Sequence, residues 1–451
     1  MKASGAGIVA TGLAGCFGNG GGNGGGNGGG NGGGNNGGGG GGNNGGGGSS
    51  EPIKVGHLAP VQHDMGKGSM RSAQMAVDKI NEDGGIMGRE VQLVKGDTQF
   101  SPSQTNTLVQ NMVDKGVVML SGTFASETML GIEDRVAHAN VPFIDTGSAS
   151  PKITQDHVGK NYDLYKNIFR CNPVNADFQA KQLANYGKFL QNQHGWDKMA
   201  VVVEDATWTQ PVTDLTPPAL KDEGIEVTMN KRIAPDTSDF TPVLDSVESS
   251  GAKVMLKAIS HIPGTSMLAT WGENQYPFAQ EGINVASMSP QYWGDTNGGC
   301  LYETTSESGA GGFAPVTDKT IPFRKAYQDR YDSRPTTPMY MGFGTYDAMF
   351  IFKNAVEEAG TADYKNNLDD IVAALEKTDY TGVAGQIQFY GKGEKYPHDV
   401  KSGVDLAPFP VTQWQKAEGG NGIAGTGGTK VGVWPEKFAS GDHKVPPWMQ
   451  G

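Results

Sequence analysis

From residue 53 onward, short apolar runs alternate with longer stretches in which apolar residues recur every three or four positions. The run Ile53–Leu58 is typical of a β-strand, and Met70, Ala73, Val77 and Ile80 would share one face of the helix that follows it. The same pattern predicts strands at 91–94, 117–120 and 141–144, and helices at 103–115 and 127–139. Because strand and helix alternate, we expect a parallel sheet flanked by helices.

A second series of this kind begins after Cys171-Asn172-Pro173. Its first strand, at 199–203, is an almost continuous apolar run, which is typical of a strand buried on both faces. Further strands are predicted at 225–229, 254–256 and 284–287, with helices at 212–222, 243–249 and 265–272, and two more helices at 323–331 and 345–359 after the glycine-rich stretch 308–312. The sequence therefore predicts two similar α/β lobes joined by more than one crossing of the chain.

Ligands of open α/β sheets bind beyond the carboxyl ends of the strands. The loops at those ends are expected at 59–68, 122–127, 146–150, 205–208, 260–262 and 290–293.

The chain has a different composition before residue 51. Of its 451 residues 69 are glycine, and residues 18–48 contain only glycine and asparagine. Such a segment has no apolar side chain whose burial would offset the cost of ordering the backbone. We therefore interpret residues 17–50 as a flexible tether.

The first residues resemble a lipoprotein signal peptide. A short apolar run at 6–14 ends in Leu13-Ala14-Gly15-Cys16, which is similar to the lipobox that precedes a lipidated cysteine. This resemblance predicts a signal peptide at 1–16, a lipid on Cys16 and an extracytoplasmic protein anchored to the outer face of the cytoplasmic membrane. The alternative is a cysteine without such a role; we favour the lipobox because Cys16 separates the apolar run from the tether. The remaining cysteines, Cys171 and Cys300, are compatible with one disulfide or, as we expect, with two buried thiols.

Charge and missing motifs exclude several classes of function. The formal net charge is −12 and no run of basic residues occurs, which argues against a nucleic-acid partner. The chain contains no Gly-x-Ser-x-Gly and no phosphate-binding Gly-x-x-x-x-Gly-Lys-Ser/Thr motif. The histidines are accompanied by neither His-Glu-x-x-His nor Cys-x-x-Cys. We therefore expect no enzyme, no cofactor and no metal.

Motifs spread from residue 51 to about 435 resemble the leucine/isoleucine/valine-binding family of type 1 periplasmic binding proteins. Each motif is weak alone, but their order and spacing are specific: Val55–Pro60, 66–80, Asn81–Arg89, Asp97-Thr98, Gly122–Glu127, Val141–Ile144, Phe169-Arg170, Tyr346–Ala348 and the stretch from Gln413-Trp414 to Val433-Trp434-Pro435.

The resemblance implies a two-lobed clamshell that closes on a small solute and presents it to the permease and ATPase of an ABC importer. Three hinge crossings are expected near 170–173, 309–314 and 383–389. Lobe I would comprise 51–171 plus about 312–383, and lobe II 172–311 plus about 384–451. An alternative with the same fold is a sensor that passes the ligand state to a membrane kinase or receptor.

The resemblance and the strand-end loops together single out candidate ligand-binding residues. Met65 would be an apolar wall, and Ala125 with Ser126 a turn that holds a ligand carboxylate. Trp208 would be an aromatic wall, although packing under a loop is an alternative, and Ser126 has a second possible role as a helix N-cap. The full set is Met65, Ala125, Ser126, Gly147, Ser148, Ala149, Asp205, Trp208, His261 and Gln291.

Two positions depart from the pattern of amino-acid binders. Ala149 lacks the hydroxyl that the second turn usually offers, and Gln291 stands where the family places a glutamate for the ligand ammonium. A charge-assisted hydrogen bond of that kind contributes about 1.5–3 kcal/mol. Ser148 and Asp205 are possible substitutes. The solute is therefore left open among amino acids, amides, urea-like compounds, carboxylates and aromatic solutes.

Overall fold

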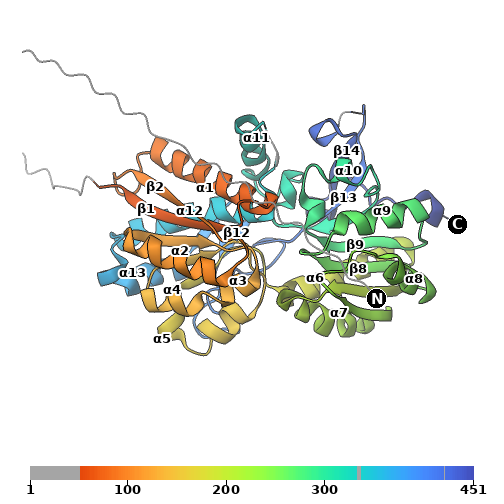
Figure 1. Cartoon of the computed structure of the whole chain (residues 1–451), viewed down its shortest axis with the longest axis horizontal. Coiled ribbons are helices and arrows are strands. Elements are labelled where there is room, and N and C mark those ends of the chain that lie inside the picture. The colour runs from red at the N-terminus through yellow and green to blue at the C-terminus, as the bar shows by residue number, and fades with distance from the viewer. Residues whose placement is uncertain (1–50, 333–336, 421, 451) are drawn as a thin grey trace, which may run out of the picture. The chain divides into compact units, whose positions relative to one another are not determined.

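The computed structural model describes residues 51–332, 337–420 and 422–450 (Figure 1). The predicted signal peptide, Cys16 and the tether lie outside the described residues. Within the described part, no helix is long and apolar enough to cross a membrane.

Lobe I is built on a sheet of five parallel strands in the order β2-β1-β3-β4-β5 (Figure 1). The strands are β1 (Ile53–Ala59), β2 (Val91–Asp97), β3 (Val117–Gly122), β4 (Phe143–Asp145) and β5 (Ile168–Arg170). The helices are α1 (Asp64–Glu82), α2 (Pro102–Asp114), α3 (Ser126–Leu130), α4 (Glu133–Ala139), the π-helix η1 (Ile153–Val158), α5 (Tyr162–Tyr165), α11 (Thr320–Arg330), α12 (Met339–Ala359) and α13 (Tyr364–Glu376). The long helices α1 and α12 pack along each other.

Lobe II is built on four parallel strands in the order β7-β6-β8-β9. The strands are β6 (Lys198–Glu204), β7 (Glu226–Ile233), β8 (Val254–Ile259) and β9 (Ala279–Asn284), and the helices are α6 (Ala176–His194), α7 (Gln210–Asp222), α8 (Thr241–Ser249), α9 (Gly264–Asn274) and α10 (Tyr292–Asp295). The predicted fold class, two parallel sheets flanked by helices, is confirmed.

Smaller elements complete the chain. An antiparallel sheet has the order β10-β13-β14, and β11 pairs with β12. These strands are β10 (Thr304–Ser306), β11 (Asp379–Thr381), β12 (Gln386–Gln388), β13 (Val411–Lys416) and β14 (Gly428–Trp434). Short 3-10 helices are η2 (Thr207–Thr209), η3 (Ala286–Met288), η4 (Ser308–Gly312), η5 (Ile423–Gly425), η6 (Glu436–Phe438) and η7 (Pro447–Met449).

Local signals specify where several helices begin and end. The Ser101 side chain accepts a hydrogen bond from the Gln104 amide at the start of α2, and Pro102 follows as the first helical residue. Asn175 caps α6 in the same way, and Gly195 ends it in the left-handed conformation that glycine adopts without strain.

Several elements differ from the sequence-based prediction, which did not include β5, α13 or the strands β10 to β14. The helix expected at 127–139 is two helices, because the chain breaks at Gly131, where an added Cβ would lie 2.7 Å from the side chain of Pro102. Helix α6 was not predicted, because its sequence mixes small and polar residues. The strand expected at 284–287 is β9, which begins five residues earlier than predicted. It contains the polar residue Glu281, which is buried because Tyr186 and other groups form hydrogen bonds with it.

The first crossing between the lobes is held by a buried ion pair. The Arg170 Nε donates to Asp399 Oδ1 at 2.9 Å, a second guanidinium nitrogen pairs with Oδ2, and both side chains are fully buried. Arg170 also donates to the carbonyls of Ser148 and Ser150, while Asp399 accepts from Asn175 at the start of α6. The pair therefore joins the edge strand of lobe I, the loop after β4 and the first helix of lobe II.

The chain from 384 to about 403 lies with lobe I rather than with lobe II. Strand β12 pairs with β11, and Asp399 forms a bridge with Arg170 in β5. The third crossing therefore comes after residue 403, later than the predicted 383–389, because these pairings hold the earlier residues against the first sheet. Cys171 and Cys300 are both buried free thiols.

We predict that Asp399→Ala lowers the free energy of unfolding by about 3–5 kcal/mol, because it leaves the Arg170 charge buried without a partner. Urea denaturation measures this change. Asp405 is the matched control, since its pair with Lys437 is exposed, with 80% of the Asp405 side chain accessible; Asp405→Ala should change the same quantity by less than about 1 kcal/mol. Equal effects of the two substitutions would contradict the role given to Asp399.

Candidate functional site

A cavity lies where the carboxyl ends of strands from both lobes meet. Its volume is about 40 Å³, whereas one water molecule needs roughly 10–15 Å³ by the same measure. Lobe I contributes the loops after β3 and β4 and the start of α12, and lobe II the loops after β6 and β8 and the end of β9. The lining residues are Phe124, Ala125, Ser126, Gly147, Ala149, Pro173, Gln179, Trp208, Ser260, His261, Ile283, Val285, Met288, Tyr340 and Phe409.

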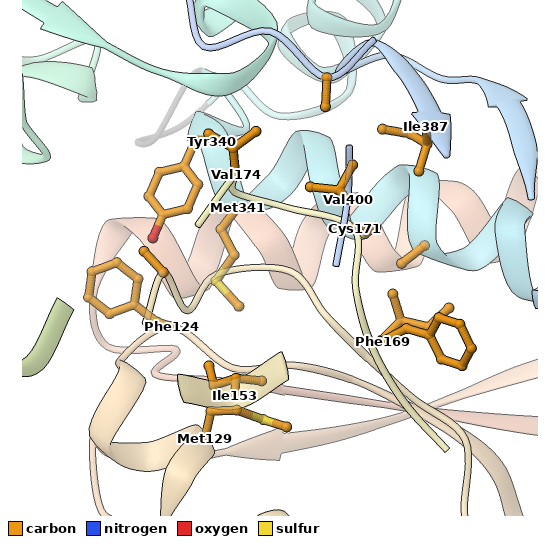
Figure 2. Close-up of a cluster of buried hydrophobic side chains, with 14 of the residues drawn as sticks. Phe124, Met129, Ile153, Phe169, Cys171, Val174, Tyr340, Met341, Ile387 and Val400 are labelled. Atoms are coloured by element: carbon orange, nitrogen blue, oxygen red, sulfur yellow. The ribbon is translucent and has the colours of Figure 1, made fainter. Parts of the chain in front are cut away.

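The walls of the cavity are mostly apolar and aromatic. Phe124 and Tyr340 face each other with ring centroids 6.4 Å apart. Figure 2 shows them in a cluster of buried side chains that includes Met129, Ile153 and Met341. Because this cluster is part of the close-packed core of lobe I, the wall that it forms is fixed before a ligand arrives.

Ser126 connects the two lobe I loops that border the cavity. Its side-chain oxygen accepts hydrogen bonds from the amides of Ala149 at 3.2 Å and Ser150 at 3.1 Å. A hydroxyl has two acceptor positions and one donor, so the Ser126 O–H remains as a donor. The helix-capping role considered for Ser126 is wrong, because Ala125 occupies the N-cap position and no side chain caps α3.

In lobe II, the buried Glu204 carboxylate positions two lining residues. Its Oε1 accepts from the Trp208 ring N–H and from His261 Nδ1, both at 2.8 Å. Its Oε2 accepts from the backbone amides of Ser260, His261 and Ile262. One strand-end carboxylate thus fixes the aromatic wall after β6 and the loop after β8.

These contacts shift two pKa values in opposite directions. Burial tends to raise the pKa of Glu204, but the hydrogen bond and the charge of His261, with the backbone amides, lower it below its usual value. Burial tends to lower the pKa of His261, but the hydrogen bond and charge of Glu204, with a smaller effect of Glu127, raise it. His261 therefore presents its free Nε2 as a hydrogen-bond donor over a wider pH range than an ordinary histidine.

An outer recess adjoins the cavity and is lined by His63, Phe100, Phe124, Ala125, Glu127, Ser260 and His261. Its rings come from both lobes: Phe124 lies 5.6 Å from His63 and 5.8 Å from His261 between ring centroids. Glu127 Oε1 accepts from the Thr207 amide of lobe II at 3.0 Å. These contacts connect the lobes beside the cavity.

The structure places six of the predicted site residues around the cavity: Ala125, Ser126, Gly147, Ala149, Trp208 and His261. The others do not line it. Met65 is fully buried in the core of lobe I, and the Ser148 hydroxyl bonds Thr123 at 3.0 Å. Asp205 faces solvent and pairs with Arg232 at 2.8 Å, whereas Gln291 is buried at the start of α10.

The sequence-based reasoning missed several lining residues, chiefly Phe124, Gln179, Tyr340 and Phe409. Phe124 lies in the strand-end loop 122–127, so the sequence could have identified it as a candidate. Tyr340 and Phe409 come from segments far along the chain, and no local pattern marks them. Among the described residues, no group of three or more His, Cys, Asp or Glu side chains is arranged to hold a metal ion.

Residues 52–403 match the model of the family described as periplasmic binding protein. The chain belongs to this family. A relative in Brucella suis, the Leu/Ile/Val-binding protein homolog 7, is 26% identical over 88% of this chain and 95% of its own length. An ABC transporter substrate-binding protein from Sphaerobacter thermophilus has the same fold, with a TM-score of 0.68, 17% identity and coverage of 87% of this chain and 99% of its own. A further one from Desulfitobacterium hafniense, solved in complex with Leu, has a TM-score of 0.63, 21% identity and coverage of 80% and 97%.

A periplasmic binding protein holds its solute without transforming it. The chain is accordingly an extracytoplasmic solute-binding protein and not an enzyme, as the sequence predicts.

We predict that His261→Gln weakens the fold most between pH 4.5 and 6.5. The raised pKa of His261 contributes stability that is complete below 6.5 and is lost as pH rises through that pKa. The lowered pKa of Glu204 contributes stability that is present above 4.5 and is lost as pH falls through it. Urea denaturation of both proteins at pH 5.5 and 8.5 measures the difference in free energy of unfolding, which should be larger at pH 5.5.

His138→Gln is the control, because His138 is an exposed residue on α4. Its effect should be small at both pH values. A His261→Gln effect that is the same at pH 5.5 and 8.5 would show that the Glu204 pair does not carry this stability.

Proposed function

We propose that the protein binds a small amphiphilic solute, an amino acid or a related carboxylate or amide, in the cavity between its lobes and delivers it to the permease and ATPase of an ABC importer. The observation that carries this proposal is that strand-end loops of both lobes line one cavity, with apolar walls and two hydrogen-bond donors, Ser126 and His261. The relatives named for Leu/Ile/Val binding, and the relative solved with Leu, support a solute of this size and chemistry.

Ligand-driven closure follows from the same arrangement. Ser126 belongs to lobe I, and Trp208 and His261 to lobe II. A solute that touches both sets binds the closed arrangement more tightly than any open one, and so shifts the population toward it. The Glu127–Thr207 hydrogen bond at 3.0 Å adds a direct contact between lobes in the closed form. The permease would then recognise the closed, loaded protein.

Membrane attachment is the second part of the proposal. A lipid on Cys16 would hold the protein at the outer face of the cytoplasmic membrane, and residues 17–50 would act as its tether. A flexible chain of that length has a typical end-to-end distance of roughly 30 Å. That reach lets the lobes capture solute and approach the permease while the anchor stays in place.

We predict that a solute at 100 times its dissociation constant adds roughly 2.7 kcal/mol to the free energy of unfolding. Thermal-shift measurements with amino acids, amides, aromatic acids and short carboxylates identify such a solute, and small-angle scattering reports the expected compaction. Ser126→Ala and Trp208→Ala should each weaken its binding by about tenfold, since each removes a donor or a wall from the cavity. Ser103→Ala, on the exposed side of α2, is the control. Unchanged affinity in both cavity variants would contradict the assignment of the cavity as the binding site.

We predict that Cys16→Ser releases the protein from the membrane. Fractionation of cells that express the two forms, followed by detergent phase partitioning, measures the lipid-dependent attachment. The unsubstituted chain should enter the membrane and detergent phases, and the variant should not. Cys171→Ser is the control, because that thiol is buried in the folded part. Identical partition of the Cys16 variant and the unsubstituted chain would contradict the lipid anchor.

A further inference from the structure

No carboxylate lines the cavity. The lining residues are all among the described residues, and these include every Asp and Glu of the chain, since 1–50, 333–336, 421 and 451 contain neither. The charged partner that would neutralise a ligand ammonium is therefore missing from the cavity wall.

The acidic groups nearest the cavity are Glu204, Glu127 and Asp145, and none of them lines it. Both oxygens of Glu204 already accept hydrogen bonds, and the residue is fully buried behind Trp208 and His261. Glu127 belongs to the outer recess and accepts from the Thr207 amide. Asp145 lies beneath the loop after β4, where its Oδ1 accepts from two loop amides and burial raises its pKa to about 8. Asp145 is accordingly mostly protonated at neutral pH.

The cavity does offer one unsatisfied acceptor. Gln179, in the first turns of α6, is 2% exposed and lines the cavity. Its Nε2 donates to the Val174 carbonyl at 2.8 Å, which fixes the amide orientation because a carbonyl only accepts. Its Oε1 is buried without a hydrogen-bond partner. A buried acceptor of this kind is costly to leave unpaired, so it calls for a donor from the ligand.

Two other lining residues, Ser126 and His261, offer hydrogen-bond donors, in contrast to the acceptor of Gln179. The Ser126 hydroxyl has both acceptor positions filled by the Ala149 and Ser150 amides, so it is left to donate. His261 donates through Nδ1 to Glu204, and in its protonated form, which that carboxylate favours, the ring also has an Nε2–H donor. Two donors from opposite lobes suit a ligand carboxylate, which accepts at both oxygens.

We infer that the cavity selects a small carboxylate that carries a neutral O–H or N–H donor beside the carboxylate, such as a 2-hydroxy acid, and that Gln179 is the residue that sets this preference over an α-ammonium. The inference rests on the proposed function and narrows its solute class. An ammonium can donate to an amide oxygen, but it would give up its hydration without meeting an opposite charge, and it would lie in the same cavity as the His261 donor. A neutral hydroxyl gives the same hydrogen bond without that cost.

Matched ligands test the inference on the purified chain. Each set has one apolar tail and three head groups: lactate, alanine and propionate; 2-hydroxy-4-methylpentanoate, leucine and 4-methylpentanoate; phenyllactate, phenylalanine and 3-phenylpropionate. Isothermal titration gives the dissociation constants. In the set whose tail fits, the hydroxy acid should bind at least tenfold more tightly than the amino acid and than the unsubstituted acid.

Substitution of Gln179 assigns the preference to this residue. Gln179→Leu removes the acceptor at similar size, so the hydroxy acid should lose its advantage over the unsubstituted acid. Gln179→Glu adds the missing charge, so the amino acid should gain at least tenfold relative to the hydroxy acid. Gln191→Leu and Gln191→Glu, on the same helix and away from the cavity, are the matched controls and should change neither ratio. Melting curves identify any variant that fails to fold, and the ligand sets on the unsubstituted chain remain decisive in that case.

The possible outcomes distinguish failure of this inference from failure of the proposed function. Amino acids that bind as tightly as or more tightly than their hydroxy counterparts overturn the inference and leave the proposed function standing. A preference for hydroxy acids that survives Gln179→Leu overturns the role of Gln179. If none of the nine ligands binds and scattering shows no compaction, both the inference and the proposed solute class are overturned.

Discussion

The Arg170–Asp399 ion pair is the interaction on which the arrangement of the cavity depends. Its charges are fully buried, so they are tolerated only because each has several partners. Those partners are the loop after β4, through the Ser148 and Ser150 carbonyls, and the start of α6, through Asn175. The loop supplies two lining residues and the helix supplies Gln179. One buried pair at the first crossing thus sets the distance between elements of different lobes that line the same cavity.

Within lobe II, a second buried acidic residue holds cavity-lining groups in place. Glu204 gathers the Trp208 ring, the His261 ring and three backbone amides at the end of β6. Because both oxygens are engaged, this carboxylate shapes the cavity wall without offering charge to a ligand. The chain is acidic overall, yet its cavity is not. Net charge therefore describes the surface of this protein and says little about its solute.

The sequence predicts the periodic part of this structure and some of the cavity. Alternating apolar runs locate most strands within a few residues, and strand-end loops contain Ser126, Trp208 and His261. The failures have physical causes. Strand β9 contains Glu281, a polar residue that makes the strand hard to recognise from the sequence. Glu281 is buried only because distant residues hydrogen-bond it. Tyr340 and Phe409 reach the cavity through the return of the chain to lobe I and the third crossing, which no local pattern encodes.

Under the proposed function, the unpaired donor and acceptor of the cavity would couple recognition of the solute to closure of the lobes. Ser126, on lobe I, has only a donor left, and Gln179, on lobe II, has a buried acceptor, its Oε1, without a hydrogen-bond partner. In the structure these two groups are not bonded to each other, so neither satisfies the other. A solute that accepts from one lobe and donates to the other satisfies both at once, whereas one that lacks either group leaves a buried polar atom unpaired. Selectivity and closure then have the same origin, since the cost of the empty closed form is the cost that the correct solute removes.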